Sequence, residues 1–273
     1  MLPRSLSRSR LLLATITATA AAVPAMALAV PAHAQASVSY VALGDSYSSG
    51  VGAGDYYSSS GDCDRSPNAY PVLWSNANSP SSFDFVACSG ATTQDVISSQ
   101  LSALSSSTSL VSISIGGNNV GFSSVMETCV LDSTSSCVSA IDQAESEMQT
   151  ELPGALDTLY SDISSDAPNA QVVVLGYTDL YDLSQSSGCI GLSTTDRTDL
   201  NQAADELDST IESAAQSYGF TWVDVRSAFD GHQICDSDSW LHSVNFLDID
   251  ESYHPTATGQ ADGYYPQFSD AVG

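Results

Sequence analysis

The sequence predicts an α/β fold in which helices cover both faces of a parallel sheet, because short apolar runs alternate with longer helical patterns. One of these runs contains three consecutive valines, which is typical of a strand buried on both faces. Polar motifs follow several of the runs, as expected at the carboxyl ends of parallel strands. The five expected strands are Val38–Leu43, Phe83–Ala87, Leu110–Ile115, Gln171–Leu175 and Phe220–Val225.

The clearest helical pattern spans residues 200–218, where apolar residues recur every three or four positions. We expect Thr195 to cap the start of this helix and Gly219 to end it. Two further helices are expected at residues 93–104 and 138–165, the second with an interruption or kink at its proline.

The chain begins with the layout of a secretory signal. Three arginines precede an apolar run at residues 11–30, and the small-residue pattern Ala32-His33-Ala34 follows. The run is mostly Ala and Thr and contains Pro24, which favours a cleaved signal over a membrane anchor. We therefore expect a signal peptide at residues 1–34, with Ala34-Gln35-Ala36 as a second cleavage pattern, and an extracellular protein.

Residues 35–273 are long enough for one sizeable domain. Beyond the expected signal, the chain has only three arginines and no lysine against 32 acidic residues. Such a charge repels phosphate backbones and anionic membranes. We expect a monomer that binds no nucleic acid and does not insert stably into membranes. The acidity is explained equally by a solvated surface and by adaptation to salt.

All cysteines lie beyond the expected signal, and an even number in an exported chain predicts disulfides. No Cys-x-x-Cys pair is present, which argues against a zinc ribbon. Six cysteines allow fifteen pairings. They are Cys63, Cys88, Cys129, Cys137, Cys189 and Cys235.

The first strand leads into Gly44-Asp45-Ser46-Tyr47-Ser48. A serine on such a turn exposes its hydroxyl and leaves its backbone N–H free to donate, as an acyl-transfer nucleophile requires. An ordinary serine turn would have the same letters, so this motif alone does not settle its role.

Three later motifs supply complementary groups. Gly90 lets the backbone approach a ligand closely after the second strand, and Asn118 can donate to an oxyanion after the third. His254 offers a base near neutral pH. The alternatives His232 and His242 have no motif around them.

Together, GDSY at 44–47, the Gly90 loop, GGNN at 116–119 and YHP at 253–255 resemble the four blocks of the GDSL/SGNH hydrolases. Their order matches too, over essentially the whole mature chain, and the resemblance is closest to secreted actinomycete lipases, esterases and phospholipases. It implies a flavodoxin-like three-layer α/β/α fold.

The resemblance also implies the roles of the site residues. Ser46 would be the nucleophile and His254 its general base. The N–H groups of Ser46 and Gly90, with the Asn118 side chain, would form the oxyanion hole. It further implies the pairs Cys63–Cys88, Cys129–Cys137 and Cys189–Cys235.

The favoured function is hydrolysis of carboxylic esters, above all lipid acyl esters, without a cofactor or metal. Deacetylation of polysaccharides is the second hypothesis, and a binding protein that has lost catalysis is the third. We expect loops to form the acyl pocket, so chain-length and head-group preferences are not predicted.

Two positions depart from the family pattern. Asn119 stands where aspartate is usual, and Glu251 stands three residues before the histidine, where the family also has aspartate. Either the Glu251 carboxylate or the backbone carbonyl of Ser252 would orient His254, and we favour the carbonyl. A calcium site at Asp248, Asp250 and Glu251 is disfavoured because no metal-loop pattern surrounds them.

Overall fold

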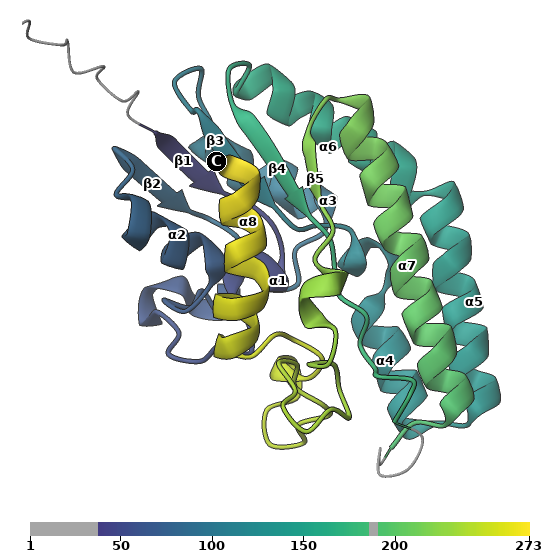
Figure 1. Cartoon of the computed structure of the whole chain (residues 1–273). Helices are drawn as coiled ribbons and strands as arrows, with labels where there is room; N and C mark the ends of the chain where they lie inside the picture. The colour runs from purple at the N-terminus through teal and green to yellow at the C-terminus, as the bar shows by residue number, and fades with distance from the viewer. Residues whose placement is uncertain (1–37, 186–190) are drawn as a thin grey trace, which may run out of the picture. The chain divides into compact units, whose positions relative to one another are not determined.

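The centre of the protein is a parallel sheet in the order β2-β1-β3-β4-β5, seen in a computed structural model that describes residues 38–185 and 191–273 (Figure 1). Every neighbouring pair of strands runs parallel. The five expected strands are therefore confirmed, four of them shorter than the apolar runs. They are β1 Ser39–Ala42, β2 Ser82–Phe85, β3 Leu110–Ile113, β4 Gln171–Leu175 and β5 Thr221–Val223.

The inner strands form the core because both of their faces are covered. All four residues of β3 are buried, as are the last four of β4, including the three valines. The edge strand β2 instead alternates exposed and half-buried residues. This pattern follows from helices lying on both sides of a parallel sheet.

Helices α2 (Tyr70–Asn78) and α8 (Tyr265–Val272) pack together on one face, with α2 against β2 and α8 against β4 and β5. In Figure 1, α8 crosses in front of the sheet. Helices α6 (Leu152–Asp166) and α7 (Thr194–Ser217) pack on each other on the other side, where α7 contacts β5. Helix α5 (Thr134–Thr150) packs on both of them, which gives the three-layer arrangement.

The structure corrects the start of α7. Its cap is Ser193, not Thr195, and the Ser193 hydroxyl and the Asp196 carboxylate form a reciprocal capping box. The first turn is polar and precedes the apolar repeat, so the repeat does not reveal it. Gly219, with φ of +71°, follows the helix end as predicted.

The expected helix at 138–165 is two helices, α5 and α6, which meet at Glu151. Pro153 lies in the first turn of α6, where a missing N–H costs nothing. The expected helix at 93–104 is a continuous run of α3 (Thr93–Asp95), a π-helical turn and a 3-10 turn that ends at Ala103.

Helices α2, α4 (Phe122–Leu131) and α8 were not predicted. Each has ten residues or fewer, too short for a clear apolar repeat. Helices of this length depend on tertiary packing for their stability. No helix within the described ranges is long and apolar enough to cross a bilayer. The expected signal peptide and both cleavage patterns lie outside the described residues.

Two of the three expected disulfides are present, Cys63–Cys88 and Cys129–Cys137. The third expected pair includes Cys189, which lies outside the described residues, so that pair stays a prediction. Cys63–Cys88 ties the loop after the Ser46 turn to the segment that carries Gly90. Its neighbours reinforce the tie, because the Ser89 N–H donates to the Cys63 carbonyl at 3.1 Å.

Replacing both Cys63 and Cys88 by serine should lower the free energy of unfolding by about 3 kcal/mol, because their disulfide constrains the unfolded chain. It should also lower esterase activity, since the Gly90 segment loses its anchor. The matched control is Cys129→Ser with Cys137→Ser, which opens a shorter loop that does not carry Gly90 and should lower activity less. Thermal unfolding and ester hydrolysis measure both effects. Equal activity losses in the two variants would contradict a specific role for Cys63–Cys88.

Candidate active site

The turn that carries Ser46 joins β1 to the single helical turn α1 (Ser46–Ser49). Gly44 has φ of +125°, and a Cβ there would lie 2.5 Å from the Ser114 carbonyl oxygen, so only glycine fits. The Asp45 side chain caps α1 by accepting from the Tyr47 N–H at 3.1 Å. Ser46 is the first helical residue, so its own N–H has no acceptor within the helix.

Two buried glutamines hold this turn from elements on opposite faces of the sheet. The Gln100 amide accepts from the Gly44 N–H at 2.8 Å and donates to the Gly44 carbonyl at 2.9 Å. The Gln260 amide donates to the Tyr47 carbonyl at 3.0 Å and accepts from the Tyr70 N–H at 2.9 Å. A buried amide with both ends bonded fixes its neighbours firmly, because losing either bond would leave an unsatisfied polar group.

His254 reaches Ser46 across the site. Its Nε2 lies 2.7 Å from Ser46 Oγ, and its Nδ1 lies 3.0 Å from the Ser252 carbonyl oxygen. A carbonyl can only accept, so Nδ1 carries the proton and Nε2 accepts from the serine hydroxyl. Burial lowers the pKa of His254 to about 4, which keeps the ring neutral near pH 7.

The Glu251 carboxylate is bonded elsewhere. Its Oε1 accepts from the Tyr56 hydroxyl at 2.7 Å, and that hydroxyl accepts from the Gly52 N–H at 2.9 Å. The acceptor facing the His254 Nδ1 is therefore the Ser252 carbonyl, the arrangement that the sequence analysis favoured.

The other two histidines of the described chain are held away from Ser46. The His232 ring stacks on Trp240 with centroids 3.6 Å apart, and its Nδ1 contacts the Asp238 carbonyl. The His242 Nε2 donates to the Gly52 carbonyl at 2.8 Å. Within the described ranges, no cluster of three or more His, Cys, Asp or Glu side chains is arranged to hold a metal ion.

Tyr47 links the Ser46 turn to the segment that carries His254, a contact that the sequence analysis missed. Its hydroxyl donates to the Tyr253 carbonyl at 2.7 Å. Tyr253 has φ of +66°, an unfavourable conformation for a bulky residue. Its N–H donates to the His242 carbonyl, and the His242 N–H donates to the His254 carbonyl. These bonds offset the cost of that conformation at the residue before His254.

The two remaining predicted site residues come from neighbouring loops. Gly90 has φ of +74° with open space beside it. Asn118 Nδ2 donates to the Ala91 carbonyl at 3.1 Å, which leaves its second amide hydrogen for another acceptor. The departure at Asn119 is structural, because its amide bonds both the N–H and the hydroxyl of Thr93.

Tyr177 is a second residue that the sequence analysis missed. It lies just beyond the carboxyl end of β4, and that position was the available signal. Its hydroxyl donates to the buried Asp45 carboxylate and accepts from the Gly117 N–H at 3.1 Å. The Asp45 carboxylate also accepts from the Ser114 hydroxyl. Burial raises the pKa of Asp45 to about 6. Tyr177 thus fixes the Ser46 turn relative to the GGNN loop.

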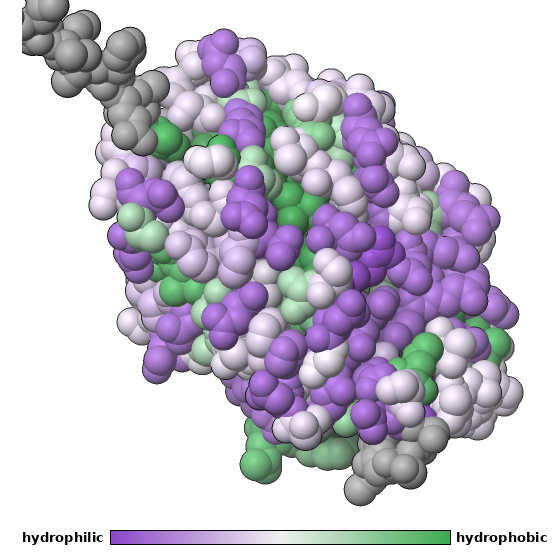
Figure 2. Space-filling model, in the orientation of Figure 1, coloured by the Kyte–Doolittle hydropathy of each residue, from purple (hydrophilic) through white to green (hydrophobic). Residues whose placement is uncertain are grey.

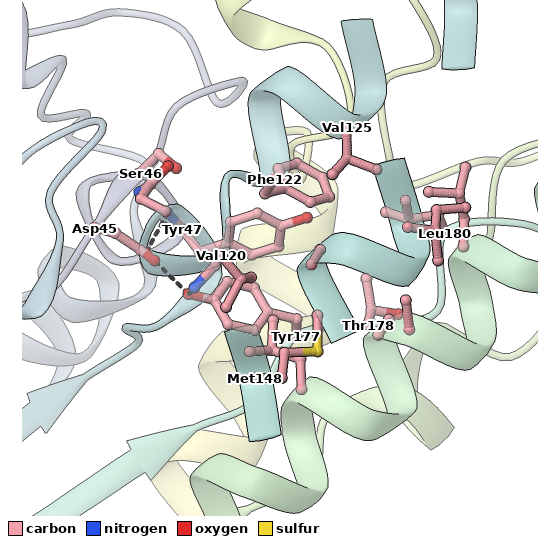
Figure 3. Close-up of a pocket in the computed structure, with 18 residues that line it drawn as sticks. Asp45, Ser46, Tyr47, Val120, Phe122, Val125, Met148, Tyr177, Thr178 and Leu180 are labelled. Atoms are coloured by element: carbon pink, nitrogen blue, oxygen red, sulfur yellow. Dashed lines mark hydrogen bonds between the residues drawn. The ribbon is translucent and has the colours of Figure 1, made fainter. Parts of the chain in front are cut away.

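An apolar pocket opens beside Ser46 (Figure 3). Its walls are mostly helical, whereas the sequence analysis expects loops to form the acyl pocket. Helix α4 contributes Phe122 and Val125 to the walls, and α5 contributes Ile141 and Met148. Helix α7 contributes Leu200 and Leu207.

A parallel α/β/α sheet with a serine–histidine pair beyond its carboxyl edge, beside an apolar pocket, fits the SGNH type of hydrolase. The chain belongs to the GDSL-like lipase/acylhydrolase family, which it matches over residues 42–261. It is a carboxylic ester hydrolase, as its relatives indicate.

Three relatives show how near these likenesses are. Lipase 1 of Streptomyces coelicolor is 59% identical over 87% of this chain and 88% of its own. The crystal structure of phospholipase A1 from Streptomyces albidoflavus NA297 is 54% identical with a TM-score of 0.84, covering 86% of this chain and 99% of its own. The crystal structure of the extracellular lipase from Streptomyces rimosus is 49% identical with a TM-score of 0.84, and the match covers 86% of this chain and 100% of the lipase chain.

Glu251→Gln should reduce turnover by less than about tenfold, because the Ser252 carbonyl already holds the tautomer of His254. Asp250→Asn, an equal charge change at an exposed neighbour, is the control. Steady-state hydrolysis of a soluble ester measures both variants. A loss on the order of a thousandfold for Glu251→Gln, with His254 still in place in a crystal structure, would assign the orienting role to the carboxylate.

Proposed function

We propose that this protein is a secreted hydrolase of lipid acyl esters that works through an acyl-enzyme on Ser46. The observation that carries the proposal is the hydrogen bond between Ser46 Oγ and His254 Nε2, with Ser46 lining the apolar pocket. It joins a nucleophile, its base and a site for an acyl chain.

In acylation, Ser46 Oγ attacks the ester carbonyl while His254 Nε2 takes the hydroxyl proton. The neutral imidazole is ready to accept this proton near pH 7, because burial depresses its pKa. The Ser252 carbonyl keeps the other ring proton on Nδ1 and helps to carry the charge of the imidazolium. As a neutral acceptor, it stabilises that charge less than a carboxylate would.

The tetrahedral oxyanion would be held by the N–H groups of Ser46 and Gly90 and by the Asn118 side-chain amide. One such donor is typically worth about 3 kcal/mol of activation free energy. As the intermediate collapses, His254 returns its proton to the leaving alcohol. A water molecule then attacks the acyl-enzyme, with His254 again as the base, and Ser46 is restored.

The pocket favours a lipid acyl chain over the alternatives. Leu, Ile, Val, Met and Phe side chains line it, and such a lining stabilises a bound acyl chain because it removes the hydrocarbon from water. An acetyl group on a polysaccharide would leave most of this apolar surface unused. A binding protein without catalysis would not need the hydrogen bond between Ser46 and His254.

The secreted location is supported by the signal layout in residues 1–34 and by the name of the Streptomyces rimosus relative, an extracellular lipase. Residues 36–273 form one compact unit, which supports a single catalytic domain after the signal. The disulfides fit an oxidising compartment. We propose that this domain acts as a monomer.

Ser46→Ala should lower turnover by at least about ten-thousandfold without changing the melting temperature, and His254→Ala should do nearly the same. Exposed Ser58, replaced by alanine, is the control and should keep full activity. A panel of esters from acetyl to long acyl chains measures the rates, and a serine-directed phosphonate should label Ser46. Labelling at another serine would refute the nucleophile, and a preference for acetyl esters would refute the lipid substrate.

A further inference from the structure

A second apolar feature lies on the surface, on the loop that precedes His254. Phe246, Leu247 and Ile249 are 77%, 99% and 60% exposed within four consecutive positions. A contiguous apolar patch of this kind marks an interaction site on a soluble protein, whereas scattered single residues do not. The other exposed large hydrophobic residues of the described chain are single and lie in separate segments: Tyr57, Leu131 and Leu183.

The loop is built to present these side chains outward. The Asn245 side chain accepts from the Leu247 N–H at 3.1 Å and from the Asp248 N–H at 3.3 Å, which fixes a tight turn. The Asn245 N–H donates to the Ser252 hydroxyl at 2.8 Å and closes the loop. In Figure 2, hydrophobic surface is visible at the lower end of the molecule, where the yellow-green loop of Figure 1 lies.

This loop is continuous with the active site. Ser252, which closes the loop, is also the residue whose carbonyl bonds His254 Nδ1. Glu251, at the end of the loop's 3-10 turn, bonds Tyr56 beside the nucleophile segment. A surface that receives the apolar side chains would therefore lie next to the catalytic pair.

The negative charge around the patch determines which kind of partner surface it can approach. Asp248 and Asp250 are interspersed with the apolar residues, and Glu251 follows them. Asp64 lies close enough to all three that their repulsion adds to burial in raising its pKa. Because the mature chain also has no lysine, an anionic surface would be repelled, whereas a neutral or zwitterionic one would not.

We propose that Phe246, Leu247 and Ile249 insert into the surface of aggregated neutral or zwitterionic lipid and hold the active site against it. This inference rests on the proposed function, because lipid acyl esters with long chains are aggregated in water. Burying three apolar side chains in the acyl boundary would supply the attraction that the charge of the protein cannot.

The test uses the mature protein and vesicles of ether-linked phosphatidylcholine, which has no acyl ester to cleave. Cosedimentation should show binding by the wild type. The triple variant Phe246→Ser, Leu247→Ser and Ile249→Ser should bind at least about tenfold more weakly. Leu247→Ser alone should show part of this loss. Leu131→Ser, an exposed leucine on α4, is the control and should bind like the wild type. Anionic lipid added to the vesicles should weaken wild-type binding.

All of these variants should hydrolyse a monomeric, water-soluble ester at the wild-type rate, because the changed side chains lie outside the catalytic machinery. Vesicle binding is measured without hydrolysis. If the wild type does not bind vesicles but still hydrolyses a soluble ester, the proposed lipid-binding surface is wrong, whereas the proposed function stands. Equal binding by the triple variant, or an equal loss in Leu131→Ser, would also overturn the proposed surface. Self-association that the triple variant abolishes, without vesicle binding, would assign the patch to a second copy of this chain.

Discussion

The site depends on bringing Ser46 within hydrogen-bond distance of His254, a residue 208 positions later in the chain. The sheet fixes Ser46, because β1 leads directly into the turn that carries it and two buried glutamines hold that turn. No strand leads into His254. Its position depends on a loop whose last residue before the histidine, Tyr253, has an unfavourable backbone conformation. The Tyr47 hydroxyl, one residue from Ser46, donates to the Tyr253 carbonyl and joins the two halves of the site, the Ser46 turn and the His254 loop.

Burial shifts the pKa values of His254 and Asp45 in opposite directions. His254 has its pKa lowered from 6.5 to about 4, so between these values the unfolded chain binds more protons and stability rises with pH. Asp45 has its pKa raised from 3.8 to about 6, so the folded chain binds more protons and stability falls as pH rises through that window. The two effects oppose each other under mildly acidic conditions, while the neutral histidine keeps its catalytic form.

Much of the fold could be predicted from sequence because buried parallel strands are continuous apolar runs, and the run at 171–175 became β4 unchanged. The Ser46 and His254 motifs were recognisable because four blocks occur in a fixed order. Tyr47 and Tyr177 were missed, since a hydrogen bond to a distant carbonyl or carboxylate leaves no periodic trace. The pocket was also missed, because its walls come from helices whose inward faces look like ordinary core.

The most direct test of this account is the kinetics of Tyr47→Phe on a soluble ester. The substitution keeps the ring packing and removes only the hydroxyl that bonds the Tyr253 carbonyl. We expect kcat to fall about tenfold or more with KM nearly unchanged, because the histidine loses its alignment and the pocket does not change. Tyr56→Phe, which removes a hydroxyl bonded to Glu251 instead, should leave kcat within a few-fold of wild type. A Tyr47→Phe variant with wild-type kcat would show that the tie between the two halves is not what places His254.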